Sequence, residues 1–518
     1  MADRLVPIGS AGGRAAAVLV AAVILSALLA VGLRADVLSG LGPGAWAAVR
    51  FTLAQAALSA VLSVGLAIPV ARALARRQFY GRGVLITLLG APFILPVIVA
   101  VLGLLAVFGR AGWINGALTA FGLPEVSIYG MHGVVLAHVF FNLPLSARLL
   151  LQGWQAIPAE RFRLAAQLDL PPRAVWRVLE RPLLVRVVPG ALALVFVICL
   201  TSFAVALTLG GGPRATTIEL AIYQAFRFDF DLGKAALLSL VQLGLAGGAA
   251  LIAFLVIPQI RFGTGLGRLQ QRWDGIGTLQ RLADTVWITA ASFFLLGPLC
   301  AVVASGLSGL GKVPFSVWLA AWTSLWMALL SIFVLLVLAL PMAGWIASRT
   351  RGGGEAVGLL GLSASPLMIG TGWFILLNPV VNPTDVALIV TAVVNALIAL
   401  PFALRVLVPP VRDTLEQFSR LGAALNLRGW GFWRWVILPR VRPQIGFAAG
   451  LTGALSVGDL GVIALFADPD RATLPLQMYR LMGAYRMEAA AGAALVLLTL
   501  ALGLFWLCDR GGRWHAEV

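Results

Sequence analysis

The sequence predicts an all-α polytopic membrane protein, with about twelve transmembrane helices arranged as two tandem, parallel six-helix units. The chain is 60% hydrophobic and 11% charged, with a mean hydropathy of +0.96, which leaves too little polar surface for a soluble protein of 518 residues. Apolar runs of about 20 residues, each long enough to cross roughly 30 Å of hydrocarbon, recur along the chain. A polar segment that starts at Arg163 also recurs 257 residues later, at Arg420, which indicates that the two halves are copies of one unit.

Six apolar segments are expected to span the membrane in each half. The first is too long for a typical signal-peptide core, so we interpret it as a retained helix. Prolines and polar residues interrupt the fourth and the ninth, and such breaks are tolerated where neighbouring helices or a cavity satisfy the freed backbone groups. The expected spans are 15–33, 48–70, 84–108, 131–151, 187–209 and 235–257 in the first half, and 286–307, 319–345, 357–377, 386–408, 445–466 and 488–507 in the second.

The distribution of basic residues predicts that both termini are cytoplasmic. With twelve alternating spans, this orientation places 28 of the 38 Lys and Arg residues on the cytoplasmic side. The net charge of +17 is then explained by membrane orientation and by contact with anionic lipid. It requires no nucleic-acid partner.

The chain is expected to divide into a first unit of residues 1–260, a cytoplasmic linker of residues 261–284 and a second unit of residues 285–518. No stretch outside the apolar segments is long enough for an independent soluble domain, so no ATPase is expected within the chain. Residues 306–312 read GLSGLGK, close to a phosphate-binding loop, but Val313 stands where Ser or Thr would hold Mg²⁺. The chain also lacks Gly-x-Ser-x-Gly and His-Glu-x-x-His motifs, and we expect no enzyme activity.

A polar loop occurs in each half, at residues 152–186 and 409–443, which we call the first and second repeated loops. Apolar residues at helical spacing predict a short amphipathic helix, a turn, and a second helix that is stopped by a proline, Pro182 in the first loop. One such loop would fit a helix on the membrane surface, but two copies favour paired docking of a partner, which the small Ala165 and Ala166 would let approach closely. The expected docking residues are Arg163, Leu164, Ala165, Ala166, Leu168, Asp169 and Pro182 in the first loop, and Arg420, Leu421, Gly422, Ala423, Leu425, Asn426 and Pro439 in the second.

Both repeated loops resemble the cytoplasmic signature E-A-A-x-x-x-G-x9-I-x-L-P of ATP-binding-cassette (ABC) importer permeases. Its Glu-Ala-Ala falls on residues 163–165 and 420–422, where Arg replaces the Glu, and its Gly falls on Asp169 and Asn426. The signature proline follows 13 residues after the Gly position in both loops. Asp and Asn tolerate the left-handed backbone that a Gly implies, so we expect the turn to be kept.

The resemblance covers nearly the whole chain and is greatest to the fused, two-unit permeases of bacterial thiamine and thiamine pyrophosphate importers. Residues 209–225, 456–466 and 473–479 carry it. Ferric-iron permeases share the fused layout and are the alternative. The resemblance implies a type I importer of the bacterial inner membrane that works by alternating access, with a periplasmic binding protein and two copies of a cytoplasmic ATPase. ATP and Mg would bind to that ATPase, and no cofactor would bind to this chain.

Asp459 is the one acidic residue that falls clearly within an apolar span, where an ionisable group costs roughly 2.5–3.5 kcal/mol and usually serves a function. We expect it to be a counter-ion for the cationic thiazolium ring along the substrate path, and a helix-packing hydrogen bond with Ser456 is the alternative. Ser202 occupies the aligned position in the first half, which suggests an asymmetric path. An ion-coupled secondary transporter would instead be expected to show inverted repeats or several buried acids.

Two external segments, residues 213–234 and 468–488, alternate charged and apolar residues. We expect them to dock the two lobes of a binding protein, and the alternative is that they cap the helix bundle. The charged residues expected at this docking surface are Arg214, Glu219, Arg227, Asp468 and Arg471.

Overall fold

The computed structural model describes residues 11–37, 40–90, 92, 94–212, 215–256, 277–349, 365–466 and 472–514. Within these ranges the chain forms helices and no β-strand. Eleven of the described helices are long and apolar enough to cross a membrane. The predicted class, an all-α polytopic membrane protein, is confirmed.

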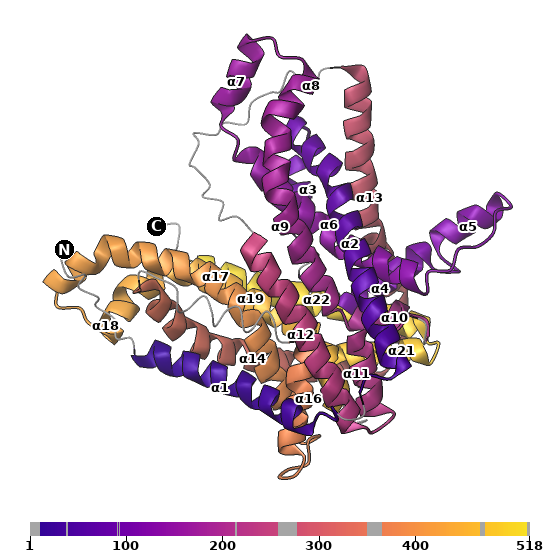
Figure 1. The fold of residues 1–518 in the computed structure, drawn as a ribbon, viewed down its shortest axis with the longest axis vertical. Helices are drawn as coiled ribbons and strands as arrows, with labels where there is room; N and C mark the ends of the chain where they lie inside the picture. Colours follow the sequence, from indigo (N-terminus) through magenta and orange to yellow (C-terminus); the bar gives the residue numbers. More distant parts are fainter. Residues whose placement is uncertain are drawn as a thin grey trace.

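The helices of the first half run from α1 to α12 (Figure 1). Their bounds are α1 Ala11–Arg34, α2 Pro43–Arg76, α3 Arg82–Leu88, α4 Val97–Phe108, α5 Trp113–Ala120, α6 Met131–Gln155, α7 Ala159–Gln167, α8 Pro172–Val175, α9 Arg181–Leu200, α10 Ala204–Leu209, α11 Ile218–Arg227 and α12 Leu232–Val256.

The second half contains the remaining helices. Their bounds are α13 Thr278–Gly309, α14 Phe315–Ala347, α16 Pro366–Leu377, α17 Ala387–Ala424, α18 Trp430–Phe432, α19 Leu438–Val457, α20 Gly461–Phe466, α21 Leu474–Gly483 and α22 Met487–Arg513.

Three predicted spans are interrupted in the structure. The span 84–108 comprises α3 and α4, the span 187–209 comprises α9 and α10, and the span 445–466 comprises α19 and α20. The last two breaks flank a cavity described below, which is where a helix can end within a membrane without burying unpaired backbone groups.

The predicted span 357–377 is described only in part. Its described part is α16, a twelve-residue helix that begins at Pro366, and residues 357–364 lie outside the described residues. Proline favours the first turn of a helix because it has no amide hydrogen to leave unpaired. Eleven of the about twelve predicted spans thus match candidate spans among the described residues, and α16 is the described part of the remaining one.

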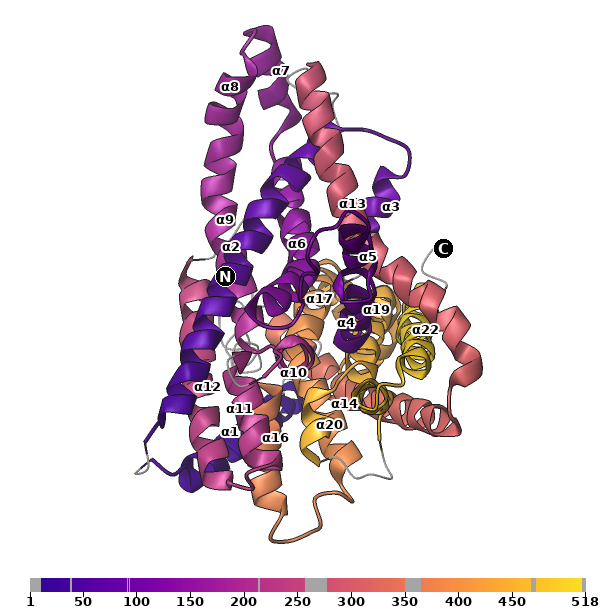
Figure 2. The same ribbon diagram turned by 90° about the vertical axis from the view of Figure 1, so that its right-hand side faces the viewer.

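The first helix of each half packs against the other half. Helix α1 contacts α14 and α16, whereas α13 contacts α2 and α4 (Figures 1 and 2). One continuous core of buried apolar residues joins α1, α11, α14, α17 and α22. The two halves are thus interlocked, and the predicted unit boundaries at 260 and 285 stay a prediction.

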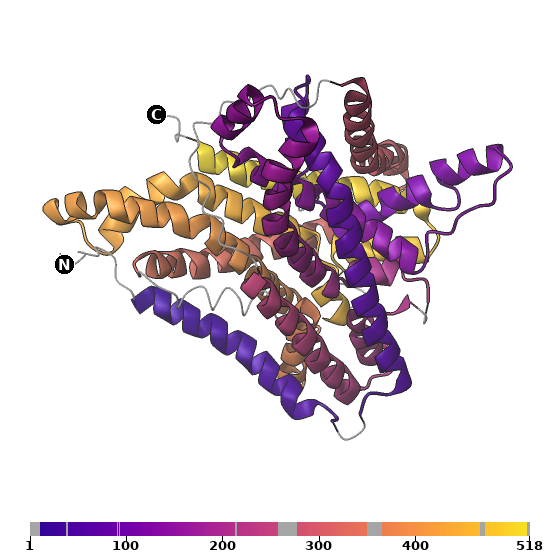
Figure 3. The same cartoon turned by 45° about the horizontal axis from the view of Figure 1, so that its top comes forward.

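The repeated loops lie at the ends of two diverging groups of helices (Figures 1 and 3). Helices α6 and α9 lead to α7 and α8, and helices α17 and α19 lead to α18. Helix α17 continues without a break through the region that corresponds to α7, whereas a turn after Gln155 separates α6 from α7. The second repeated loop is therefore a direct extension of a long helix.

Candidate functional site

The two repeated loops share one backbone conformation. Asp169 and Asn426 have φ values of 46° and 54°, both in the left-handed region. In the first loop the amide of Leu170 donates to the carbonyl of Ala165 at 3.0 Å and that of Asp169 to Ala166 at 3.0 Å. This pair of backbone hydrogen bonds is typical of a helix that ends with a residue in the left-handed conformation. The predicted Gly-like turn at both positions is confirmed.

The second loop repeats the same two hydrogen bonds at its own helix end. The amide of Leu427 donates to the carbonyl of Gly422 at 2.8 Å, and that of Asn426 donates to Ala423 at 3.1 Å. In both loops one π-helical turn follows, Trp176–Glu180 and Trp433–Ile437. Pro182 and Pro439 then lie in the first turns of α9 and α19, where a proline is tolerated, so neither stops its helix.

Each repeated loop presents two exposed leucines one helical turn apart. Leu164 and Leu168 are 56% and 62% exposed, and Leu421 and Leu425 are 54% and 62% exposed. Residues four apart lie on one face of a helix, so each pair forms a single apolar strip. Arg163 and Arg420, which precede the strips, are also exposed. Two matched surfaces of this kind suit a partner that presents two equivalent grooves.

The small residues of the loops serve internal packing, which corrects one prediction. Ala165 is only 4% exposed, and Gly422 is buried as well, so neither backbone is open to a partner. A Cβ at Gly422 would lie 2.4 Å from Cε2 of the buried Phe432. At the offset of 257 residues, Ala165 corresponds to Gly422 and Val175 to Phe432. The first loop thus pairs a larger residue with a smaller one, Ala with Val, where the second loop pairs Gly with Phe. Ala166 is exposed, in line with the prediction.

The difference in side-chain size between the Ala165–Val175 and Gly422–Phe432 pairs leads to a prediction. We expect Gly422→Ala to destabilise the second repeated loop by about 1–3 kcal/mol, because overpacking forces buried groups apart. Gly422→Ala combined with Phe432→Val should recover most of the loss, because it copies the first loop. Hydrogen exchange of residues 416–440 would measure both. Equal exchange in the single and the double variant would contradict this account.

A buried acid ties the first repeated loop to the helices beneath it. Glu180 is fully buried, and its Oε2 accepts a hydrogen bond from Arg72 Nε at 2.8 Å, with Arg76 at 4.0 Å. Trp154 Nε1 donates to Oε1 at 3.3 Å. The corresponding position in the second half is Ile437, so only the first loop has this anchor.

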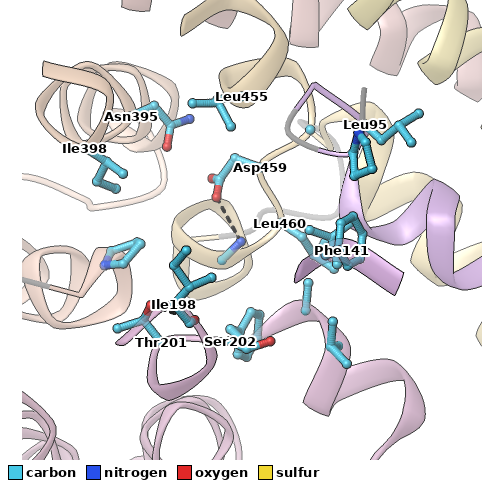
Figure 4. A pocket seen from close by; sticks show the side chains of 18 of the residues that line it. Leu95, Phe141, Ile198, Thr201, Ser202, Asn395, Ile398, Leu455, Asp459 and Leu460 are labelled. Carbon is cyan, nitrogen blue, oxygen red and sulfur yellow. Dashed lines mark hydrogen bonds between the residues drawn. The ribbon is translucent and has the colours of Figure 1, made fainter. Parts of the chain in front are cut away.

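A cavity of about 380 Å³ lies between the two halves (Figure 4). It is bordered by the break between α9 and α10 and by the break between α19 and α20. The polar side chains on its wall are His138, Asn142, Thr201, Ser202, Asn395 and Asp459, and the aromatic ones are Phe141, Phe203 and Phe402.

Asp459 and Ser202, predicted from the sequence for the substrate path, both line this cavity. Asp459 Oδ1 accepts a hydrogen bond from the amide of Gly461 at 3.1 Å, drawn in Figure 4. Its Oδ2 is enclosed and has no hydrogen-bond partner among the described residues. Asp459 is also the only acidic residue among the described residues of the wall. The cavity wall thus carries a single carboxylate, that of Asp459, among its described residues.

Ser456, the third residue predicted for the path, lies behind the wall. It is fully buried, shares a hydrogen bond with Ser331 at 2.8 Å, and accepts one from Asn395 Nδ2 at 3.2 Å. The structure therefore gives Ser456 a supporting role, in which it orients the Asn395 side chain that faces the cavity.

The first half holds its own polar group in the same way. His138 is buried, with Nε2 2.7 Å from Ser202 Oγ and Nδ1 3.2 Å from Ser59 Oγ. Asn395 stands 257 residues after His138, so the two halves place a polar side chain at matching points of the cavity.

The predicted binding-protein surface stays a prediction, from which the structure removes one residue. Arg227 is exposed, as the prediction requires. Glu219 is fully buried and cannot take part in an external docking surface, which corrects that prediction. Arg214, Asp468 and Arg471 lie outside the described residues.

Comparison with known proteins places the chain in a family. No protein-family model matches it. The thiamine transport system permease protein ThiP of Escherichia coli (strain K12) is 40% identical over 478 residues, which cover 90% of this chain and 89% of the relative. The protein of the same name from Brucella suis biovar 1 is 39% identical over 522 residues, covering 98% and 96%, and that from Salmonella typhimurium is 40% identical over 530 residues, covering 98% and 97%. The chain belongs to the thiamine transport system permease family.

In this permease Glu219, on the short helix α11 outside the candidate spans, lies in a buried polar cluster. Its neighbours are Gln242 of α12 and Ser365, which precedes α16. Neither carboxyl oxygen of Glu219 is in a well-formed hydrogen bond, and the Ser365 hydroxyl is likewise unpaired among the described residues. Burial raises the pKa of Glu219 from 4.5 to about 7, an effect that Ser365 and Gln242 partly oppose.

The raised pKa predicts a pH-dependent stability. The buried carboxyl is neutral at low pH. Its contribution to the free energy of unfolding is therefore fully present below about pH 4.5 and is lost as the pH rises through about 7. The difference between the ordinary and the raised pKa of Glu219 corresponds to about 3 kcal/mol of unfolding free energy. We expect the unfolding temperature of the purified permease to fall between pH 5 and pH 8, and Glu219→Gln to remove most of that fall. An identical fall in both proteins would contradict the assignment.

Sequence reasoning missed several groups that the structure brings together in this permease. The arginines that bind Glu180 were counted only as charges that set the orientation, and Glu180 itself was not singled out. His138 and Asn395 share the offset of 257 residues that identified the repeated loops, so that offset was an available signal. The Glu219 cluster joins α11, α12 and α16, and no local pattern reveals such a contact.

Proposed function

We propose that this chain is the transmembrane permease subunit of an ATP-driven ABC importer that moves thiamine and thiamine phosphates across the bacterial inner membrane by alternating access. The observation that carries the proposal is the identity of about 40% over nearly the full length with permeases named for thiamine transport. Neither ferric iron nor ion coupling, the alternatives from the sequence, is favoured by these names or by the cavity.

The partners of the proposed importer follow from its two ends. The exposed leucine strips of the repeated loops would bind two copies of a cytoplasmic ATPase, which would hold ATP and Mg, and this chain would carry out no covalent chemistry. A periplasmic binding protein would deliver the substrate at the opposite end, near the exposed Arg227. The concentration of basic residues in and around the repeated loops supports the orientation with both termini in the cytoplasm.

The cavity between the halves is the proposed substrate site. Its volume of about 380 Å³ falls in the range of small-molecule pockets. The Asp459 carboxylate on the wall suits a cationic ring, and the rings of Phe141, Phe203 and Phe402 can stack on it or face it as cation–π partners. Asn142 and Asn395 offer amide groups for the polar edge of a heterocycle.

Growth of thiamine-requiring cells tests the proposal. A bacterial strain that cannot make thiamine, and from which its own permease gene has been deleted, would receive this chain together with its ATPase and binding protein. We expect growth on nanomolar thiamine and uptake of labelled thiamine that stops when ATP is depleted. Growth rescued only by millimolar thiamine, with or without this chain, would contradict the proposal.

A further inference from the structure

The face of α6 that lines the cavity between the halves continues toward the first repeated loop. Phe141 and Asn142 lie on the cavity wall, and Leu145 follows one helical turn later. Beyond Leu145 the same face carries Arg148 and Gln152, because residues three or four apart lie on one side of a helix. Helix α6 therefore presents one continuous strip from the cavity toward the end that carries the repeated loop.

A second, smaller cavity of about 210 Å³ lies on this strip. The residues that line it are Leu145, Arg148, Leu149 and Gln152 of α6, together with Leu89 and Gly90 between α3 and α4. The connection between α3 and α4 continues to Pro92 and Leu95, which line the larger cavity. The two cavities thus share two walls. The smaller one lies nearer the repeated loops, since α3 lies on the side of α4 toward α7 and α8 (Figures 1 and 2).

Arg148 is the charged residue of the smaller cavity. A Cβ at Gly90 would lie 2.5 Å from Arg148 Nη1, so the missing side chain of Gly90 leaves the space that the guanidinium occupies. Arg148 is exposed, and it has no hydrogen bond or ion pair with another described residue. A guanidinium carries five N–H donors in a planar fork that matches the oxygens of a phosphate. The smaller cavity is therefore suited to a phosphate group.

The second half carries a matching arginine. Arg405 of α17 stands 257 residues after Arg148. Ile398 and Phe402 of the same helix line the larger cavity, and Arg405 follows Phe402 by three residues, on the same face. Arg405 is also exposed and has no ion pair within the part of the chain that the structure describes. Each half thus places one exposed arginine between the larger cavity and its repeated loop.

We propose that Arg148 and Arg405 form a phosphate-binding site, which takes the pyrophosphate of thiamine pyrophosphate as this substrate passes from the larger cavity toward the repeated loops. The inference rests on the proposed function and assigns residues to the phosphorylated substrates. Thiamine pyrophosphate combines a cationic ring with an anionic tail, and Asp459 and the two arginines offer the opposite charges in that order along the path. Thiamine itself carries no group for the arginines. A lipid headgroup offers the same phosphate chemistry, and the experiment separates the two sources.

Arg148→Gln combined with Arg405→Gln tests the site in liposomes that contain the permease, its ATPase and its binding protein. We expect ATP-driven uptake of labelled thiamine pyrophosphate to fall at least tenfold, because charge-assisted hydrogen bonds to the phosphates are lost. Uptake of labelled thiamine should stay within twofold. Lysine at both positions keeps the charge and should restore at least half of the thiamine pyrophosphate uptake.

The matched control is Arg50→Gln. Arg50 is an exposed arginine near the start of α2, two residues before Thr52, which accepts a hydrogen bond from the amide of Ile218 of α11, and it lines neither cavity. Its replacement should leave the uptake of both compounds within twofold of the unmodified protein.

Two results with the double Gln variant would overturn the site. One is full uptake of thiamine pyrophosphate. The other is an equal loss of thiamine and thiamine pyrophosphate uptake, which would assign the arginines to packing, or to a lipid headgroup if the loss appears only in liposomes with added phosphatidylglycerol. Uptake of thiamine but not of its pyrophosphate by the unmodified protein would also overturn this inference alone. Absence of ATP-driven uptake of both compounds by the unmodified protein would instead contradict the proposed function.

Discussion

Asp459→Asn is expected to reduce ATP-driven thiamine uptake at least tenfold. The substitution keeps the size of the side chain and its hydrogen bond with the amide of Gly461, but it removes the only acidic group among the described residues of the cavity wall. Loss of one member of an enclosed charge pair costs about 2–5 kcal/mol, because the remaining charge is left without compensation. The effect should appear as a higher KM for thiamine, measured from initial uptake rates in liposomes.

Two controls separate a charge effect from a structural one. Asp459→Glu keeps the charge and should retain more uptake than Asp459→Asn. Ser202→Ala, on the same wall, should cost less than threefold, because Ser202 bonds to His138 and carries no charge. Basal ATP hydrolysis should be unchanged in all three. Uptake by Asp459→Asn at the rate of the unmodified protein would show that the carboxylate is not a counter-ion.

Leu168→Asp combined with Leu425→Asp is expected to abolish binding of the ATPase. Both leucines are 62% exposed on the strips of the repeated loops. Burial of a leucine side chain contributes about 1.5–3 kcal/mol, so loss of both should weaken binding at least a hundredfold. A buried aspartate without a partner would weaken it further. Co-purification of the ATPase with the permease, and titration of purified ATPase, would measure the change.

The control for this prediction is another leucine that is more than half exposed and lies outside the loops. Leu123 is 52% exposed and lies beyond α5, so Leu123→Asp should leave ATPase binding unaltered. Each single loop variant should have an intermediate effect, since the two strips are matched. Normal co-purification of the double variant would mean that the ATPase binds elsewhere on the chain.

Local features of the fold could be predicted because local chemistry determines them. The left-handed turns at Asp169 and Asn426 follow from residue types that tolerate positive φ at a fixed distance from a proline. The spans follow from hydropathy, and Asp459 was identified because an acid within an apolar segment is costly.

Features that depend on tertiary contacts could not be predicted. Ala165 was expected to face a partner, but it packs inside its own loop. Glu219 was expected at the surface because it lies in a charged segment, yet a contact with the other half buries it completely. The interlocking of α1 with α14 and of α13 with α2 leaves no trace in hydropathy, because hydropathy identifies an apolar segment but not the segment that it packs against.

The most direct test of the central claim is uptake of labelled thiamine into liposomes that contain the purified permease, its ATPase and its binding protein. The account predicts accumulation that requires ATP and all three proteins, and that is lost with Leu168→Asp combined with Leu425→Asp. Accumulation driven by a proton or sodium gradient without ATP would contradict it. So would transport of ferric iron in place of thiamine under the same conditions.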